Sequence, residues 1–215
     1  MIQVLLVEDD PMARQLLELY IDKSERYEIA GSLETALLAE AFCRKHHVDV
    51  ILMDVCTAMN INGIDIAIDI KNHMPEIKII VITSQPECSY IDRARAAGVD
   101  SFWYKSSTAE EIILLMERTL AGESIYPDST PQLRLGNAWS EDFSERERQV
   151  LRHVVAGKSD AAIAEELHIS VPTVKSHVQH MKNRTGFSNR TELAVKAREI
   201  GFVIIDRKPD EIPQE

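Results

Sequence analysis

Cysteine is scarce in this chain of 215 residues, and the pattern of the few cysteines excludes two common kinds of site. The three cysteines are Cys43, Cys56 and Cys88, and no two of them form a Cys-x-x-Cys pair. An odd number without that spacing argues against a disulfide framework and against a cysteine-ligated zinc site. We therefore expect three reduced thiols.

Long apolar runs are also missing. No segment approaches the roughly 18 to 20 uncharged apolar residues that are needed to span a bilayer. The N-terminus shows no basic region followed by an apolar stretch and a small-residue cleavage site. We therefore expect a soluble protein of the cytoplasm that has no membrane partner.

Basic residues are outnumbered, and the net charge of −11 at first argues against a nucleic-acid partner. The charge is not uniform, however. Residues 1–121 carry −9, residues 122–142 carry −3, residues 143–205 carry +3 and residues 206–215 carry −2. An acidic half joined to a mildly basic half is expected when only the second half meets a polyanion.

The first half alternates short apolar runs with segments of helical period. The runs are rich in branched residues and too short for helices, which predicts strands at 4–7, 48–53 and 77–82, with weaker candidates at 27–31 and 101–104. Helical patterns cover 11–23, 33–46, 63–72, 87–97 and 108–121. Five alternating units predict an α/β fold with a doubly wound, five-stranded parallel sheet.

The second half has a different pattern. Glycine, proline and small polar residues without a long apolar period predict a linker over 122–142. Four short helical patterns follow, at 144–156, 159–167, 170–185 and 189–200. We therefore expect two domains, at 1–121 and 143–205, and a flexible tail at 206–215.

Polar side chains stand at the ends of four predicted strands, and in a sheet of this kind the carboxyl ends of the strands form the functional site. In chain order they are Glu8, Asp9, Asp10, Asp54, Thr83, Ser84 and Lys105. Three carboxylates within about 4 to 5 Å repel by several kcal/mol per pair, so such a site needs a divalent cation. Hard oxygen ligands favour Mg²⁺, and an aspartate beside the metal and a lysine can act as a nucleophile toward a phosphoryl group. The alternative is that each acid is a solvated loop residue or a helix cap, as the pair Asp10-Pro11 suggests.

The segment 159–185 predicts two helices joined by a short turn around His168 and Ile169. The second helix carries an apolar stripe of Val174, Val178 and Met181. Its other sides hold residues that can contact bases or phosphates, namely Thr173, Lys175, Ser176, Gln179 and Lys182. By pattern alone, a small helical dimerisation or capping domain with a solvated polar face remains an alternative.

Over residues 1–121 the sequence resembles response-regulator receiver domains, whose fold is flavodoxin-like (CheY-like). The motifs that carry the resemblance are Leu6-Val7-Glu8-Asp9-Asp10-Pro11, Leu52-Met53-Asp54, Val81-Ile82-Thr83-Ser84 and the stretch from Ala97 to Lys105. The resemblance implies that Asp54 accepts a phosphoryl group and that Thr83 and Lys105 hold its oxygens. It also implies an Mg²⁺ site, whose ligands would be Glu8, Asp9, Asp54 and the main-chain carbonyl of Cys56. Phe102 would be the switching aromatic residue.

One departure concerns the loop after Asp54. The family usually has a proline four residues after the acceptor and a glycine eight residues after it, whereas this chain has Ala58 and then Gly63, nine residues on. The loop is thus one residue longer, which bears on the metal geometry and on the lifetime of the phosphoryl group.

Residues 143–205 resemble the LuxR-type helix-turn-helix, through Phe143 to Ser159, Ile163 to Ser170 and Thr173 to His177. Together with the receiver, this places the chain near the NarL/FixJ group and implies a small four-helix DNA-binding domain. DNA contacts are expected from Thr173, Lys175, Ser176, His177, Gln179 and Lys182. In this chain Lys182 and Thr185 replace leucines that are usual in the family, which predicts a looser last turn.

The resemblance implies a non-enzymatic transcription regulator that is controlled by phosphorylation. Its implied partners are a sensor histidine kinase, double-stranded promoter DNA, a second copy of the chain on phosphorylation and, as a further candidate, RNA polymerase. Two alternatives stay open. One is a DNA-binding regulator that ignores phosphorylation because its receiver is atypical, and the other is an Mg²⁺-dependent aspartyl phosphohydrolase.

Overall fold

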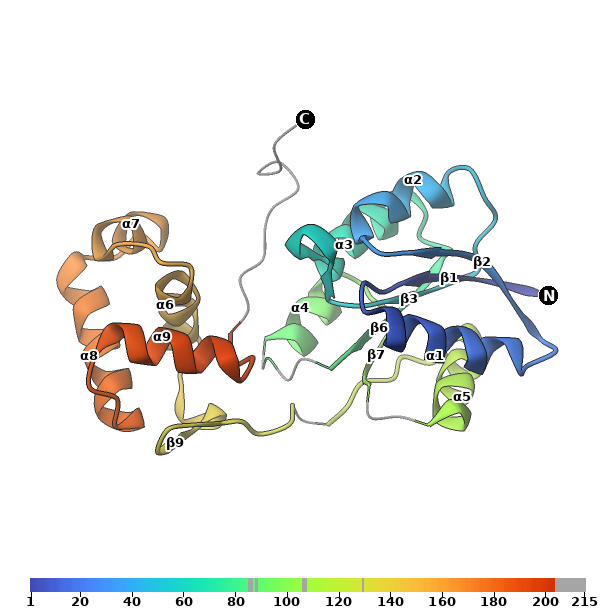
Figure 1. The fold of residues 1–215 in the computed structure, drawn as a ribbon. Coiled ribbons are helices and arrows are strands. Elements are labelled where there is room, and N and C mark those ends of the chain that lie inside the picture. Colours follow the sequence, from blue (N-terminus) through green and yellow to red (C-terminus); the bar gives the residue numbers. More distant parts are fainter. Residues whose placement is uncertain (85–86, 88, 106–107, 129, 204–215) are drawn as a thin grey trace. The chain divides into compact units, whose positions relative to one another are not determined.

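The computed structural model describes residues 1–84, 87, 89–105, 108–128 and 130–203 (Figure 1). Residues 1–84 and 89–128 belong to one compact unit and residues 130–203 to a second. Cys88 and the predicted tail at 206–215 lie outside the described residues. Among the helices of the described part, none combines the length and the apolar character that a membrane crossing requires.

The first unit is built on a five-stranded parallel sheet with the order β2-β1-β3-β6-β7. Its strands are β1 (Ile2–Val7), β2 (Tyr27–Leu33), β3 (Val50–Met53), β6 (Lys78–Thr83) and β7 (Ser101–Tyr104). All four residues of β3 are buried, because this central strand is covered on both faces. The strand order is that of the flavodoxin-like fold, which confirms the predicted fold class.

Helices cover both faces of the sheet (Figure 1). They are α1 (Pro11–Asp22), α2 (Ala39–Cys43), α3 (Gly63–His73), α4 (Tyr90–Ala96) and α5 (Ala109–Leu120). Helices α1 and α5 contact each other and share one apolar cluster with β1, β3 and β6, while α2, α3 and α4 contact one another in turn. The predicted capping box of α5 is present, since Thr108 and Glu111 bond to each other's backbone N–H.

The helix expected over 33–46 is much shorter than predicted. Strand β2 runs on to Leu33, a 3-10 turn covers Ala36–Leu38, and α2 has only five residues. The backbone before α2 is held by the loop that follows β3: Ala58 N–H donates to the Glu34 carbonyl and Ala36 N–H donates to Thr57 Oγ1. These tertiary hydrogen bonds compete with the helical hydrogen bonds that the sequence pattern favoured.

The second unit is helical. Its helices are α6 (Glu145–Val155), α7 (Asp160–Glu166), α8 (Val171–Thr185) and α9 (Arg190–Glu199). Each N-cap side chain, from Ser144, Ser159, Ser170 or Asn189, accepts a hydrogen bond from the first turn. The apolar faces of the four helices meet in one buried cluster that includes Val150, Ile163, Val174 and Leu193.

A small hairpin precedes these helices, within the span expected as a linker. Strands β8 (Arg134–Leu135) and β9 (Ala138–Trp139) pair antiparallel, and their Leu135 and Ala138 side chains are buried in the cluster of the second unit. The hairpin turn lies at the end of α8, where Asn137 N–H donates to the Thr185 carbonyl. The hairpin therefore packs as part of the second unit.

Candidate functional site

Three carboxylates meet at the carboxyl ends of β1 and β3. One oxygen from each of Glu8, Asp9 and Asp54 lies within 4.8 Å of the others. Glu8 and Asp54 are buried, with 1% and 7% of their surface exposed, whereas Asp9 is exposed. The structure thus brings together three of the acids that follow predicted strands. The exposed Asp9 leaves the cluster open to solvent on one side.

Lysine and threonine complete this cluster from the next two strands. The Lys105 ammonium lies 2.7 Å from Asp54 Oδ2 and 2.5 Å from Glu8 Oε2. The fully buried Thr83 hydrogen-bonds to Asp54, and its carbonyl accepts from Lys105 N–H. Thr83 and Lys105 are therefore placed where they can contact an oxygen of any group attached to Asp54.

Burial makes the acids of this cluster harder to ionise. Burial, followed by the nearby Asp54 carboxylate, raises the pKa of Glu8. Burial likewise raises the pKa of Asp54, although the Lys105 charge opposes this rise. For Lys105, burial alone would lower the pKa, but the two carboxylates outweigh it and raise the pKa. The lysine is thus charged at neutral pH, and the carboxylates would be stabilised by a further cation.

Asp10, by contrast, is a helix cap. Its side chain accepts from Ala13 N–H at 2.8 Å at the start of α1. The alternative interpretation as a helix cap therefore holds for Asp10, but not for Glu8 and Asp9, which belong to the cluster. Sequence reasoning missed Arg14, which donates to the Glu8 carbonyl at 2.8 Å and holds the backbone of the acidic loop. The one feature of the sequence that could have indicated this contact is the position of Arg14 in the first turn of α1, directly after the acidic loop.

The longer loop after Asp54 folds into a hairpin of its own. Strands β4 (Cys56–Thr57) and β5 (Ile61–Asn62) pair, and Met59 and Asn60 between them take left-handed backbone with φ of 65° and 57°. The hairpin absorbs the extra residue, and Gly63 N–H returns to the Val55 carbonyl at 2.8 Å. Cys56 lies two residues after Asp54, and the contact of its carbonyl with a metal remains a prediction.

Gly63 allows this loop to close against Asp54. A Cβ at Gly63 would lie 2.0 Å from the Asp54 carbonyl oxygen and 2.7 Å from Met53 Cγ, so the backbone of β3 would have to move. We expect Gly63→Ala to lower the free energy of unfolding by about 1–3 kcal/mol, measured by urea denaturation, and to slow the phosphoryl uptake that the sequence predicts for Asp54. Gly157→Ala, at a left-handed residue of the second unit with no atom within 4 Å of the added carbon, should cost stability without slowing uptake. Normal stability and uptake in Gly63→Ala would contradict this role.

Phe102 is fully buried on β7. Its ring packs edge-on against Tyr104 at 5.4 Å and nearly parallel to Tyr126 at 6.3 Å between centroids. Because the ring already lies inside the fold, a switch at this residue must exchange one set of buried contacts for another. Its role as a switch remains a prediction.

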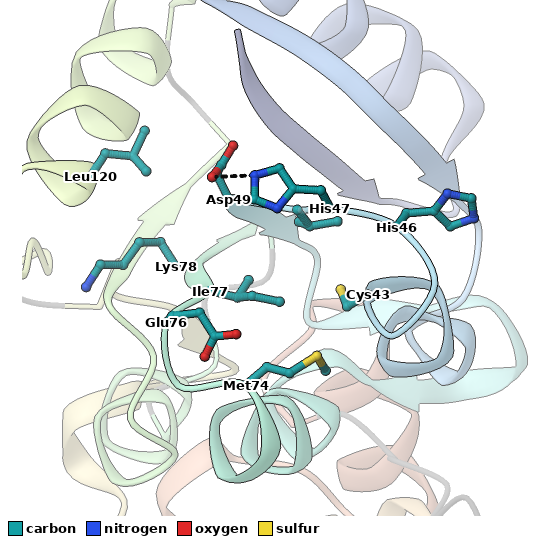
Figure 2. A pocket seen from close by; sticks show the side chains of 10 residues that line it. Cys43, His46, His47, Asp49, Met74, Glu76, Ile77, Lys78 and Leu120 are labelled. Carbon is teal, nitrogen blue, oxygen red and sulfur yellow. Dashed lines mark ion pairs between the residues drawn. The ribbon is translucent and has the colours of Figure 1, made fainter.

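A separate pocket of about 370 Å³ lies at the other end of the strands (Figure 2). It is lined by residues that precede β3 and β6, including Asp49 and Ile77. His47 faces this pocket beyond the end of α2 and pairs with Asp49 at 3.1 Å. Burial raises the pKa of the nearby Cys43 to about 11, so its thiol is neutral and a poor metal ligand. Because the pocket lies at the amino ends of β3 and β6, it is distinct from the carboxylate cluster at their carboxyl ends.

In the second unit, α7 and α8 form the expected helix-turn-helix. The turn reverses through His168, whose φ is 52°, and Ile169 N–H returns to the Ala164 carbonyl. Ser170 then caps α8. The apolar stripe of α8 is buried as predicted, at Val174, Val178 and Met181.

The outer face of α8 carries polar side chains. Of the predicted DNA contacts, Lys175, Ser176 and Gln179 are exposed, whereas Thr173, His177 and Lys182 are half-buried. Two further exposed residues share this face and were missed by sequence reasoning, His180 and Asn183. They follow Ser176 and Gln179 by four residues, a spacing that could have revealed them.

The last turn of α8 is not loosened by its two unusual residues. Thr185 is buried, and its hydroxyl donates to the Met181 carbonyl at 2.8 Å. The helix ends at Gly186, which has left-handed backbone and donates to the Lys182 carbonyl. The expectation of a looser turn was therefore wrong, since the threonine satisfies its own hydroxyl within the helix.

Two known protein families match the chain, one in each half. The response regulator receiver domain matches residues 4–117, and the luxR family of bacterial regulatory proteins matches residues 141–197. The chain is a response regulator. Its receiver and LuxR-type domain place it in the NarL/FixJ group, as the sequence resemblance implied.

Relatives match over nearly the whole chain. The response regulator protein VraR of Staphylococcus aureus strain Mu3 is 32% identical over 205 residues, which cover 91% of this chain and 96% of VraR. VraR of Staphylococcus epidermidis strain RP62A is 31% identical over the same coverage. This likeness extends through both units and the residues between them.

Solved structures share the fold. The response regulator ChrA of a heme-sensing two-component system has a TM-score of 0.52 at 21% identity and covers 94% of this chain and 98% of its own. RcsB of Salmonella enterica serovar Typhimurium, bound to promoter P1flhDC with the phosphomimetic BeF3-, has a TM-score of 0.61 at 19% identity, covering 91% and 97%. At these identities, the likeness supports the fold alone.

Proposed function

We propose that this response regulator accepts a phosphoryl group on Asp54 from a phosphohistidine of a sensor kinase and thereby controls its binding to promoter DNA. The observation that carries the proposal is the convergence of Glu8, Asp9, Asp54, Thr83 and Lys105 at one end of the sheet. In the proposed division of labour, residues 1–121 form the receiver, 122–142 the linker and 143–205 the DNA-binding domain, and the protein acts in the cytoplasm.

The carboxylate cluster fits a magnesium ion. The acids offer hard oxygen ligands within 4.8 Å of one another, and the burial of Glu8 and Asp54 raises their need for a positive partner. We assign Glu8, Asp9, Asp54 and the Cys56 carbonyl as its ligands. When bound, the ion would offset the negative charge of the incoming phosphoryl oxygens.

The chain's own residues then perform the transfer. A carboxylate oxygen of Asp54 attacks phosphorus, the P–N bond to the histidine breaks, and its electron pair returns to the imidazole nitrogen, which takes up a proton. Lys105, already within 2.7 Å of Asp54, contacts one phosphoryl oxygen, and the Thr83 hydroxyl donates to another. The product is an aspartyl phosphate on β3.

DNA binding is assigned to α8. RcsB is bound to promoter DNA in its solved structure, and the exposed face of α8 offers the side chains that such binding requires. Lys175 and Gln179 are placed to contact base edges together with Ser176, while Thr173, His177 and Lys182 contact phosphates. RNA polymerase is a further partner of a regulator of this kind.

We expect Lys175→Ala and Gln179→Ala each to weaken binding to the preferred DNA by about 1–3 kcal/mol and to relax sequence preference. The reason is that each change removes hydrogen bonds to a base edge. Equilibrium binding to the preferred duplex and to single-base variants of it measures both effects. Lys45→Ala removes the same charge from an exposed residue of the first unit and should leave affinity unchanged. An unaltered footprint in both α8 variants would show that α8 does not read the bases.

The two alternative functions make different predictions. A phosphohydrolase would turn over small phosphate esters with Mg²⁺, whereas the proposed regulator should form one stable equivalent of phosphoprotein. A regulator that ignores phosphorylation would bind DNA equally with and without the phosphoryl group. The hairpin of β4 and β5 accommodates the extra residue of the loop, which favours a receiver that can be phosphorylated over one that cannot.

A further inference from the structure

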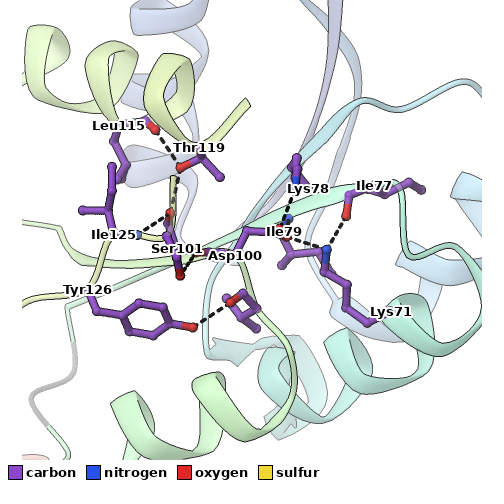
Figure 3. A network of polar contacts seen from close by, with 12 residues as sticks. Lys71, Ile77, Lys78, Ile79, Asp100, Ser101, Leu115, Thr119, Ile125 and Tyr126 are labelled. Atoms are coloured by element: carbon purple, nitrogen blue, oxygen red, sulfur yellow. Dashed lines mark hydrogen bonds and ion pairs between the residues drawn. The ribbon is translucent and has the colours of Figure 1, made fainter. Parts of the chain in front are cut away.

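The chain that leaves α5 folds back along the outer edge of the sheet (Figure 3). We call residues 124–126 the strap. Ser124 Oγ donates to the Asp100 carbonyl at 2.8 Å, and Phe102 N–H donates to the Ile125 carbonyl at 2.8 Å. Strand β7 pairs with β6 on one side, and the strap covers its other edge, with which no strand of the described residues pairs.

A directed chain of hydroxyls fixes the strap to α5 (Figure 3). Thr119 Oγ1 donates to the Leu115 carbonyl at 2.7 Å, and it lies 2.7 Å from Ser101 Oγ. Because the single proton of Thr119 is used on Leu115, Ser101 must donate to Thr119. The Ser101 oxygen then accepts from Ile125 N–H at 3.1 Å. Ser101 and Thr119 are fully buried, so the loss of this chain would leave polar atoms without partners.

Tyr126 ends the strap and contacts the predicted switch residue. Its hydroxyl donates to the Val99 carbonyl at 2.7 Å, and its ring lies nearly parallel to the Phe102 ring. The Arg95 guanidinium stands 4.4 Å from the centroid of the Tyr126 ring, a cation–π contact from α4. Burial raises the pKa of Tyr126 to about 12, so the hydroxyl keeps its proton at physiological pH.

We propose that Tyr126 is the positioning residue through which Phe102 holds the strap on β7, and that the strap is released when Asp54 is phosphorylated. This proposal rests on the proposed function. Thr83 pairs with Tyr104 across β6 and β7, and the Tyr104 ring packs edge-on against Phe102. A shift of Thr83 toward a phosphoryl group would therefore reach Phe102 through Tyr104, and a Phe102 ring that turns with Tyr104 withdraws from Tyr126. The strap then loses its ring contact and the hydrogen bond from Phe102 N–H weakens.

Release of the strap would change the reach of the linker. An extended chain spans at most about 3.3–3.6 Å per residue, so freeing residues 124–126 adds up to roughly 10 Å of tether. A longer tether lets two DNA-binding domains find paired half-sites with fewer orientational constraints. Tyr126 is therefore expected to govern the response to phosphorylation without taking part in phosphoryl transfer.

Amide hydrogen exchange of the full-length protein tests the proposal, with and without a beryllofluoride mimic of the phosphoryl group plus Mg²⁺. We expect the Ile125 and Phe102 amides to exchange at least tenfold faster with the mimic, while amides in the centre of β6 stay protected. In Tyr126→Ala, Ile125 should exchange fast in both states. Unchanged Ile125 protection in the wild type with the mimic bound would overturn the proposal.

Matched variants separate coupling from simple stability. Tyr126→Phe keeps the ring and its contacts with Phe102 and Arg95, so the DNA-affinity ratio between phosphorylated and unphosphorylated protein should stay near that of the wild type. Tyr126→Ala should bring this ratio toward one with unchanged phosphoryl uptake. A wild-type ratio in Tyr126→Ala would refute the coupling.

A protein that takes no phosphoryl group at Asp54 would contradict the proposed function and the coupling together, whereas a phosphorylated protein with a protected Ile125 contradicts the coupling alone.

Discussion

Asp54→Asn is expected to abolish phosphoryl uptake completely. The side-chain amide cannot attack phosphorus, and the Asp54 carboxylate is the one that contacts the Lys105 ammonium and hydrogen-bonds to Thr83. Intact-protein mass spectrometry after incubation with an acyl phosphate and Mg²⁺ should show one added phosphoryl group in the wild type and none in the variant. The same absence is expected in the wild type when a chelator removes the metal, because the acidic cluster then repels the donor.

Asp69→Asn provides the matched control, since Asp69 is an exposed aspartate on α3, away from the cluster. It should be phosphorylated like the wild type. Phosphoryl incorporation that survives Asp54→Asn, or that is indifferent to chelator, would show that another residue or another chemistry is responsible.

Phosphorylation is expected to strengthen binding to paired half-sites by about 10²-fold or more, with little change at a single half-site. A single small DNA-binding module buries only about 600–1,000 Å² on DNA and binds weakly. Two modules joined in a dimer bind the second half-site at a high effective concentration, so affinity rises without new contacts. Titration of the phosphorylated protein against duplexes with one or two half-sites measures this difference.

Sedimentation of the same samples reports the assembly directly. The wild type should shift from monomer to dimer with the phosphoryl mimic, and Asp54→Asn should stay monomeric under both conditions. If the phosphorylated protein stays monomeric and shows no preference for paired half-sites, then dimerisation is not the switch, and release of the DNA-binding domain from the receiver would have to account for any gain in affinity.

The strand ends were predictable because they follow from local rules. Branched apolar runs place β1, β3 and β6 in a parallel sheet, and the carboxyl ends of such strands must lie together. Glu8, Asp54 and Lys105 therefore met as expected. The apolar stripe and the caps of α8 were equally local. What the helical period could not show was that residues 34–36 are held by the β4–β5 loop, a contact made only in the folded chain.

The strap and the hairpin show a similar limit. Residues 122–142 have the composition of a linker, and their sequence contains no long period from which packing could be inferred. Tyr126 is half-buried because Phe102, Arg95 and Val99 come together from separate elements. Leu135 is buried because the helices of the second unit offer it a place in their core. Such non-local burial depends on tertiary structure and leaves little trace in composition.

Selection from a random duplex library tests whether a phosphoryl group on Asp54 controls sequence-specific DNA binding. Wild-type protein and Asp54→Asn are each incubated with acyl phosphate and Mg²⁺, and the duplexes that they retain are sequenced. We expect a motif of two half-sites that is enriched by the wild type and not by Asp54→Asn. The same motif enriched equally by both proteins, or no motif with either, would contradict it.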